Sequence, residues 1–134
     1  MPRHLQTTAV AGLMLASLLA AGCSNRESAA ARAPVSTGTG TAVVGADGVQ
    51  QIVVTGDEQF RFVPSNIRAM AGPLRIVLTN SGGTPHNLRI DGHETGLVGG
   101  GEKSQITVTL APGRHEFICT IHTRLHMMGV VIVS

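Results

Sequence analysis

The sequence predicts an all-β fold, an antiparallel β-sandwich, over residues 48–134. Three observations support this prediction. Polar and apolar residues alternate with a period of two in several runs, and each run is only about five to seven residues long. Segments rich in Gly and Pro, such as AGP, NSGGTP and APG, separate the runs. No segment keeps a convincing helical period over three turns, which excludes a helical bundle.

The expected strands follow one another along the chain with turns between them. In order they are QQIVVTG (50–56), LRIVLTN (74–80), HNLRI (86–90), SQITVTL (104–110), RHEFIC (114–119) and GVVIV (129–133). Because successive side chains of a strand point to opposite faces, His86 shares a face with Leu88 and Ile90. Phe117 and Cys119 share a face in the same way. We therefore expect the imidazole of His86 to point toward the core end of the sandwich.

The first residues are expected to direct export. Residues 1–22 have a weakly basic start, an apolar run and small residues before Cys23, which is the pattern of a signal peptide. LLAAGC resembles the lipobox of bacterial lipoproteins, which implies a lipid on Cys23; an ordinary secretory peptide is the alternative. Residues 23–47 are rich in Ser, Ala, Thr and Gly and are predicted to be a lipid-anchored flexible linker. The domain would then lie on the outer side of the cytoplasmic membrane, in the periplasm or at the cell surface.

Composition narrows the possible partners and reactions. The formal charge is +2, there is no polybasic run, and Trp and Tyr are absent, so nucleic acid is not an expected partner. The same lack of Trp and Tyr removes the usual anchors of protein interfaces, and we expect a monomer. No Ser–His–Asp arrangement, carboxylate pair or phosphate loop is evident, so the chain is not expected to be an enzyme.

The segment CTIHTRLHMM, residues 119–128, is unusually rich in metal ligands. Two residues separate Cys119 from His122, and Met127 follows five residues later, so a tight loop could turn all three side chains toward one point. His86 would supply a second imidazole from another strand. Two imidazoles, a thiolate and a weak thioether are the ligand set of blue copper. The adjacent Met128 competes for the thioether position, although the spacing favours Met127.

Other interpretations of the same residues remain open. Cys119 alone could be a buried structural thiol, the commonest role of a lone Cys. Cys119, His122 and His126 form a C-x2-H-x3-H cluster that, with His86, could bind zinc. Structural zinc sites are more often rich in Cys, which disfavours this alternative. His126 is expected at the exposed rim of the site and His93 in solvent.

Two separated motifs resemble those of the cupredoxins, in particular the plastocyanin-like group. They are PHN, at residues 85–87, and PG-x-x-x-F-x-C-x-x-H-x-x-x-x-M-x-G within APGRHEFICTIHTRLHMMGVVIV. The resemblance covers residues 60–134 and implies a Greek-key β-sandwich of the cupredoxin type. It implies one copper ion, cycling between Cu(I) and Cu(II), with the ligands His86, Cys119, His122 and Met127. It also implies that Asn87 ties the two ligand loops together by hydrogen bonds.

The resemblance further implies a mononuclear type 1 copper protein. Its expected function is to carry single electrons between a redox protein donor and acceptor at the extracytoplasmic membrane surface. His122 is the expected electron port, with Leu97 and Val98 in an apolar rim around it. Ile118 stands where plastocyanins often have the Tyr of a second exit, and His115 where the family often has a corner Tyr. Copper sequestration or delivery is the alternative function, and a metal-free adhesive sandwich is a third.

Overall fold

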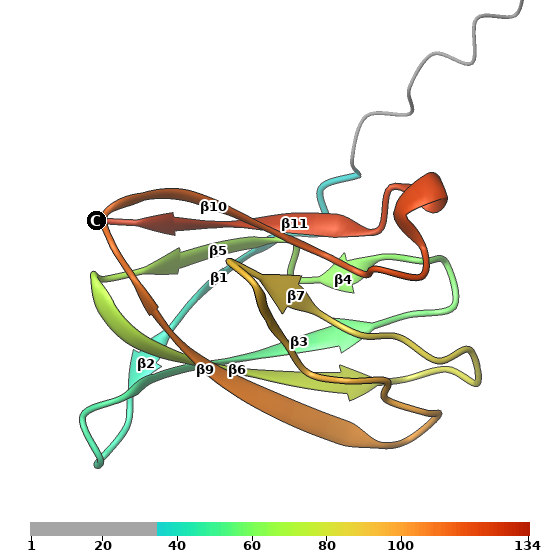
Figure 1. Ribbon diagram of the computed structural model, residues 1–134, viewed down its shortest axis with the longest axis horizontal. Coiled ribbons are helices and arrows are strands. Elements are labelled where there is room, and N and C mark those ends of the chain that lie inside the picture. The colour runs from blue at the N-terminus through green and yellow to red at the C-terminus, as the bar shows by residue number, and fades with distance from the viewer. Residues whose placement is uncertain (1–34) are drawn as a thin grey trace, which may run out of the picture. The chain divides into compact units, whose positions relative to one another are not determined.

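The predicted β-sandwich is confirmed in the computed structural model, which describes residues 35–134 (Figure 1). The first sheet has the strand order β1 (Thr39–Thr41), β5 (Asn66–Ala69), β11 (Met128–Val133), β10 (Gly113–Ile118), β7 (Arg89–Ile90) and β8 (His93–Glu94). The second has the order β2 (Val43–Val44), β3 (Gln50–Gly56), β6 (Gly72–Asn80) and β9 (Lys103–Leu110), with β4 (Phe62–Val63) paired to β3. The helix in this part of the chain is η1, one 3₁₀ turn over Thr123–Leu125.

Strand pairing is mixed rather than antiparallel throughout. β3 runs parallel to β6, and β5 runs parallel to both β1 and β11. The remaining pairs, including β6 with β9 and β10 with β11, are antiparallel. Alternation of polar and apolar residues identifies the buried face of a strand but carries no information about the strand's direction. The sequence therefore did not distinguish parallel from antiparallel pairs.

The alternation correctly predicts which side chains fill the space between the sheets. Along β6, Leu74, Ile76 and Leu78 are fully buried, while the residues between them are only partly buried. Phe62 and Phe117 meet in the core with ring centroids 5.2 Å apart. The fully buried side chains come from both sheets and include Val54, Ile67, Leu88, Ile90, Leu110 and Val131.

The folded part begins earlier than residue 48. β1 and β2 both lie inside the predicted linker, and β1 pairs with β5 while β2 pairs with β3. The linker prediction is therefore wrong for these residues, whose short, exposed strands carry no period-two signal. Cys23, the predicted signal peptide and the first part of the linker lie outside the described residues. Within residues 35–134, no helix has the length and hydropathy needed to span a bilayer.

The chain around His86 also differs from its prediction. The expected strand at 86–90 is reduced to β7, and His86 forms only an isolated bridge with Val98. Each backbone N–H of this pair donates to the carbonyl of the other, at 3.1 and 2.7 Å. His86 is nevertheless buried as expected.

Three loops meet at one end of the sandwich, opposite the C terminus (Figure 1). They connect β3 to β4, β6 to β7 and β10 to β11. These loops carry Phe60, His86 and the Cys119–Met127 segment respectively, so the fold gathers at one end residues that lie far apart in the sequence.

Candidate metal centre

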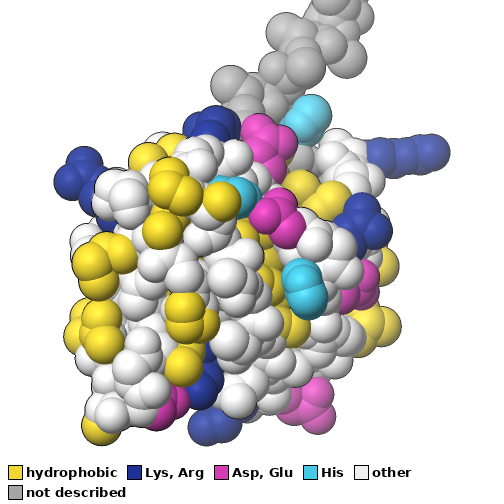
Figure 2. Space-filling model, turned by 60° about the vertical axis from the view of Figure 1, so that its left-hand side comes forward, with side chains coloured by type: hydrophobic (Ala, Val, Ile, Leu, Met, Phe, Trp, Pro, Cys, Tyr) yellow, Lys and Arg dark blue, Asp and Glu magenta, His cyan; other side chains and the backbone are white. Residues whose placement is uncertain are grey.

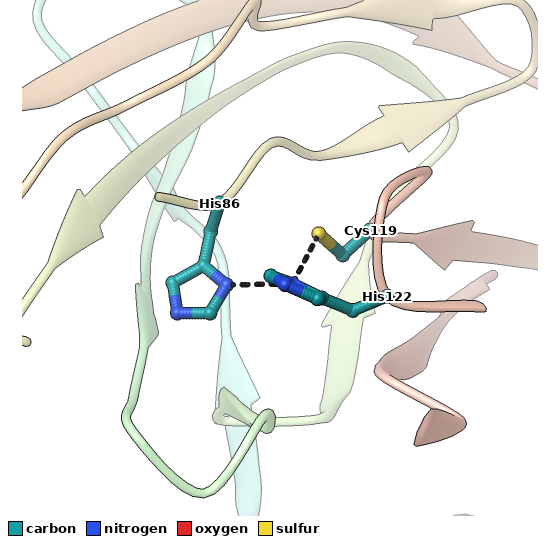
Figure 3. A group of neighbouring side chains, drawn as sticks. All are labelled: His86, Cys119 and His122. Atoms are coloured by element: carbon teal, nitrogen blue, oxygen red, sulfur yellow. Dashed lines mark hydrogen bonds between the residues drawn. The ribbon is translucent and has the colours of Figure 1, made fainter. Parts of the chain in front are cut away.

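His86, Cys119 and His122 converge at this loop end (Figure 3). The Nδ1 atoms of His86 and His122 are 3.2 Å apart, and Sγ of Cys119 is 3.3 Å from Nδ1 of His122. One potential ligand atom from each residue lies within 4.8 Å of the others. The part of the chain that the structure describes contains no other cluster of three His, Cys, Asp or Glu side chains of this kind.

Backbone hydrogen bonds shape the loop that carries Cys119 and His122. β10 ends at Ile118, and the N–H of Cys119 donates to the carbonyl of Met127 at 2.9 Å, which closes the base of the loop. The N–H of His122 donates to the carbonyl of Cys119 at 3.2 Å. η1 follows, and His126 ends it in the left-handed conformation, with φ 55°. The loop thus returns Met127 to the level of Cys119.

Burial separates the candidate ligands into two kinds. His86 and Cys119 have no exposed surface and Met127 has 1%, whereas His122 is half-buried. Met128 is the first residue of β11, pairs with Ile118 and is less buried than Met127. Burial therefore agrees with the spacing argument that favours Met127 over Met128.

The surroundings of His86 lower its pKa and so favour the neutral imidazole. Burial lowers its pKa, and the nearby His122 lowers it further, while hydrogen bonding to the backbone at Asp57 works in the opposite direction. Its Nε2 is buried and, apart from this contact with the backbone of Asp57, makes no hydrogen bond among the described residues. Its Nδ1 faces Nδ1 of His122. Gly56 makes room for the ring, because a Cβ there would lie 2.8 Å from Cδ2 of His86.

The donor set fits a single metal ion. Nitrogen and sulfur atoms that share one ion at about 2.0–2.3 Å lie roughly 3–4 Å apart, and the two separations of 3.2 and 3.3 Å fall in that range. A single hydrogen on Nδ1 of His122 cannot form full hydrogen bonds to both Nδ1 of His86 and Sγ of Cys119, whereas one cation can bind all three atoms. Imidazole and thiolate ligands suit copper in both of its common oxidation states.

Asn87 joins the two ligand loops, as the resemblance implies. Its Oδ1 accepts a hydrogen bond from the N–H of Thr120 at 2.8 Å, and its Nδ2 donates to Oγ1 of Thr120 at 2.6 Å. Nδ2 also donates to Oε1 of Glu94 at 2.6 Å. The residue after His86 is therefore fastened to the residue after Cys119.

Phe60 and Glu58 are neighbours of the site that the sequence did not identify. The ring of Phe60 meets that of His122 edge-on, with centroids 4.8 Å apart, and that of His86 at 6.3 Å. Glu58 accepts hydrogen bonds from the loop before His86. Neither residue belongs to a periodic pattern in the sequence. The signal that could have identified them is the segment DEQFR (57–61), in which an Asp and an Arg can close a short turn around an aromatic residue.

Other predicted residues lie elsewhere. His126 is exposed and is not part of the cluster, and His93 is exposed as expected. Leu97 is 64% exposed, whereas Val98 is buried, so the prediction of Val98 as a rim residue is wrong. Val98 points inward because its backbone pairs with that of His86. His115 bonds to Asp91 and to the carbonyl of Ala111.

Residues 13–133 match the family model of the cupredoxin-like domain. The fold is similar to dithionite-reduced auracyanin from the photosynthetic bacterium Roseiflexus castenholzii, with 19% identity, a TM-score of 0.57, and coverage of 63% of this chain and 96% of that one. It is similar to auracyanin B, with 20% identity, a TM-score of 0.54, and 63% and 88% coverage. A mutant fern plastocyanin, solved in oxidised and reduced forms, shows 27% identity, a TM-score of 0.51, and 62% and 100% coverage. A comparison with curated protein sequences returns no significant match.

Proposed function

Because this chain belongs to the cupredoxin-like domain family, we propose that it is a blue copper protein that carries single electrons between redox proteins. The predicted cofactor, a single copper site, agrees with this family and with the grouping of His86, Cys119 and His122. That grouping is the observation that carries the proposal, because it brings a thiol and two imidazoles together at the loop end of a cupredoxin fold.

In this proposal each side chain has its own task. Cys119 would supply a thiolate, His86 and His122 would supply imidazole nitrogens, and Met127 would supply a weakly bound thioether to one copper ion. A bound copper ion would provide the redox chemistry by alternating between Cu(I) and Cu(II). Asn87 keeps the two ligand loops in register, so that the donors change position little when the charge at the site changes.

His122 is the proposed port for the electron. It is the one member of the cluster that is only half-buried. Ile121 and Leu125, in the same loop, are 51% and 50% exposed, and Leu97 is more exposed still. Exposed apolar side chains of this kind suit brief contact with a redox partner.

On the face shown in Figure 2, Lys and Arg are spread among acidic residues, so that face offers no continuous basic surface for nucleic acid.

Burial favours electron transfer over copper delivery. A protein that hands copper to an acceptor must let the acceptor's ligands reach the ion. His86, Cys119 and Met127 have between 0% and 1% exposed surface, which leaves only the His122 side open. Such a site suits an ion that stays in place while the electron leaves. We therefore propose a carrier and expect no chemistry on a small-molecule substrate.

The test is a titration of the full-length chain with Cu(II), followed by visible absorption. We expect an intense band from thiolate-to-copper charge transfer at one equivalent, bleached by ascorbate and restored by an oxidant. Cys119→Ser should abolish the band, and Met127→Leu should change its position or the reduction potential. Met128→Leu is the matched control and should change neither. A colourless protein, or one that loses its copper on reduction, would overturn the carrier proposal in favour of delivery or of a metal-free role.

We also propose that Cys23 carries a lipid that holds the domain at the outer surface of the cytoplasmic membrane. The support is the sequence LLAAGC after an apolar run. Metabolic labelling with a radioactive fatty acid should mark the wild-type chain and not Cys23→Ala. If both are labelled or neither is, Cys23 is not the anchor.

A further inference from the structure

We propose that the loop Asp57–Arg61 braces the metal centre: Asp57 and Arg61 fix Phe60 against His122, and Glu58 fixes the loop that carries His86. This inference rests on the proposed function, because it assigns positioning residues to the same site. Its basis is that one short loop between β3 and β4 makes separate contacts with both histidine-bearing loops.

Asp57 closes the loop on itself. One carboxylate oxygen accepts hydrogen bonds from the N–H groups of Gln59 and Arg61, both at 3.0 Å. The other accepts from Nε and Nη2 of Arg61, at 2.9 and 2.7 Å. The backbones of Asp57 and Arg61 are joined as well, since the N–H of Asp57 donates to the carbonyl of Arg61 at 3.1 Å. A two-pronged ion pair combined with backbone bonds leaves the loop few alternative conformations.

Closing the loop holds Phe60 in an unusual conformation. Its φ is 57°, in the left-handed region that bulky residues rarely adopt. The N–H of Phe60 donates to the carbonyl of Asp57 at 3.1 Å, which helps to keep it there. A strained residue at a functional site indicates that the surrounding structure imposes it. Here the result is that the ring lies edge-on to His122, which is the least buried member of the metal cluster.

Glu58 holds the other histidine-bearing loop. Its Oε1 accepts hydrogen bonds from the N–H groups of Gly83 and of Thr84, the latter at 2.9 Å. Its Oε2 accepts from the hydroxyl of Thr84 at 3.0 Å. The side chain also lies directly against Gly82, where a Cβ would collide with it. Thr84 stands two residues before His86, so Glu58 fixes the segment that delivers the imidazole.

The loop therefore acts on the two imidazoles by different routes, through an aromatic contact for His122 and through a carboxylate for His86. Neither route involves a ligand atom. Removing supports of this kind around a metal site typically weakens metal retention, and removing either one here should loosen mainly the imidazole that it serves. A loop with only a general structural role would not show such separate effects.

The main experiment compares Arg61→Gln with Arg75→Gln in the full-length chain. Arg75 forms an ion pair of similar length with Asp47, at 2.9 Å, on the second sheet, so its loss is a matched control. We expect Arg61→Gln to lose copper to excess chelator about tenfold faster than wild type. We also expect greater motion of the His122 ring in the metal-free protein, measured by NMR relaxation of its Cε1–H group. Arg75→Gln should match wild type in both measurements.

Two more variants separate the routes. Phe60→Leu keeps every polar bond of the loop, and we expect it to mobilise His122, whose ring centroid lies 4.8 Å from that of Phe60, more than His86, at 6.3 Å. Glu58→Ala should mobilise His86 more than His122, whereas Asp47→Ala, which removes a carboxylate bond to the N–H of Val49 in the turn between β2 and β3, should mobilise neither. If ring motion is unchanged in Phe60→Leu and Glu58→Ala, the brace is wrong even if the wild type is blue. If the wild type binds no copper, the proposed function fails, while the motions of the metal-free rings still decide the brace.

Discussion

The body of the sandwich and its loop end are built by different kinds of interaction. Between the sheets, apolar side chains such as Leu74, Ile76 and Leu78 are removed from water, and hydrophobic burial supplies the stability. At the loop end, charged and polar contacts dominate, including the Asp57–Arg61 pair and the Asn87 hydrogen bonds. The difference indicates that the fold should tolerate damage to the loop end, whereas the metal centre should be sensitive to small changes there.

The largest expected effect comes from the body. Phe117→Ala removes a fully buried ring that packs on Phe62 and lies against Gly129 on the neighbouring strand. A buried Phe-to-Ala change usually costs about 3–5 kcal/mol, from lost burial and from the cavity left behind. Urea unfolding of the metal-free protein measures it. Ile132→Ala, at a side chain 45% exposed on the same sheet, is the control and should cost far less.

A loss below about 1 kcal/mol in Phe117→Ala would contradict the comparison. It would mean that the body is not the main source of stability and that the loop end contributes more than its contacts indicate.

The next largest effect is expected at Asn87, which should influence both the stability of the body and the copper affinity of the loop end. Asn87→Ala leaves the N–H of Thr120 without the acceptor that it has at 2.8 Å. A buried donor left unpaired costs about 1–3 kcal/mol, and loss of a group that orients metal ligands typically lowers metal affinity about 10–100-fold. Urea unfolding and a competitive copper titration measure the two quantities. Asn66→Ala, whose amide bonds to Ser36 near β1, should leave copper affinity unchanged; an equal loss in both variants would argue against a special role for Asn87.

A comparable cost in stability is expected at Gly56, where the body meets the site. In Gly56→Ala the new methyl group would lie 2.8 Å from the His86 ring, so ring or strand must move. Overpacking of this kind costs about 1–3 kcal/mol and should shift the visible band of the copper form by tilting one imidazole. Gly83→Ala is the control, because the atom nearest to the added carbon, an oxygen of Glu58, would be 3.9 Å away. Identical spectra for both variants would show that the His86 ring is not confined by β3.

The same contrast explains what the sequence could predict. The alternation in β6 and β9 predicts their buried faces because the polarity of each side chain depends only on whether that position faces the core or the solvent. Ligand spacing in CTIHTRLHMM predicts Cys119 and His122 together because one loop carries both. The contact of Phe60 with His122 spans more than sixty residues and depends on a left-handed turn, which no periodic pattern reveals. The pairing of β1 with β5 was missed because a strand of three residues is too short to carry a periodic pattern.

The smallest expected effect lies away from the metal centre, at His115. Its Nε2 lies 2.8 Å from the carbonyl of Ala111 and its Nδ1 lies 2.7 Å from the Asp91 carboxylate. Both neighbours are acceptors, so the ring is best satisfied when both nitrogens carry hydrogens. The carbonyl of Ala111 and the Asp91 carboxylate accordingly raise the pKa of His115, against a partial burial that lowers it. The next charged groups along the strand, Arg114 and Glu116, pair with each other at 3.4 Å.

A raised pKa fixes the sign of the pH dependence. The stabilisation by His115 should be complete below the ordinary His pKa of about 6.5 and should disappear as pH rises through the higher folded value. Because the pair is partly exposed, the effect should be below about 1 kcal/mol. The lowered pKa of His86 gives the metal-free protein an opposite slope, so the quantity to measure is the difference in unfolding free energy between wild type and His115→Gln from pH 5.5 to 8. That difference should shrink as pH rises; a difference that grows with pH would mean that His115 is bound as the neutral ring.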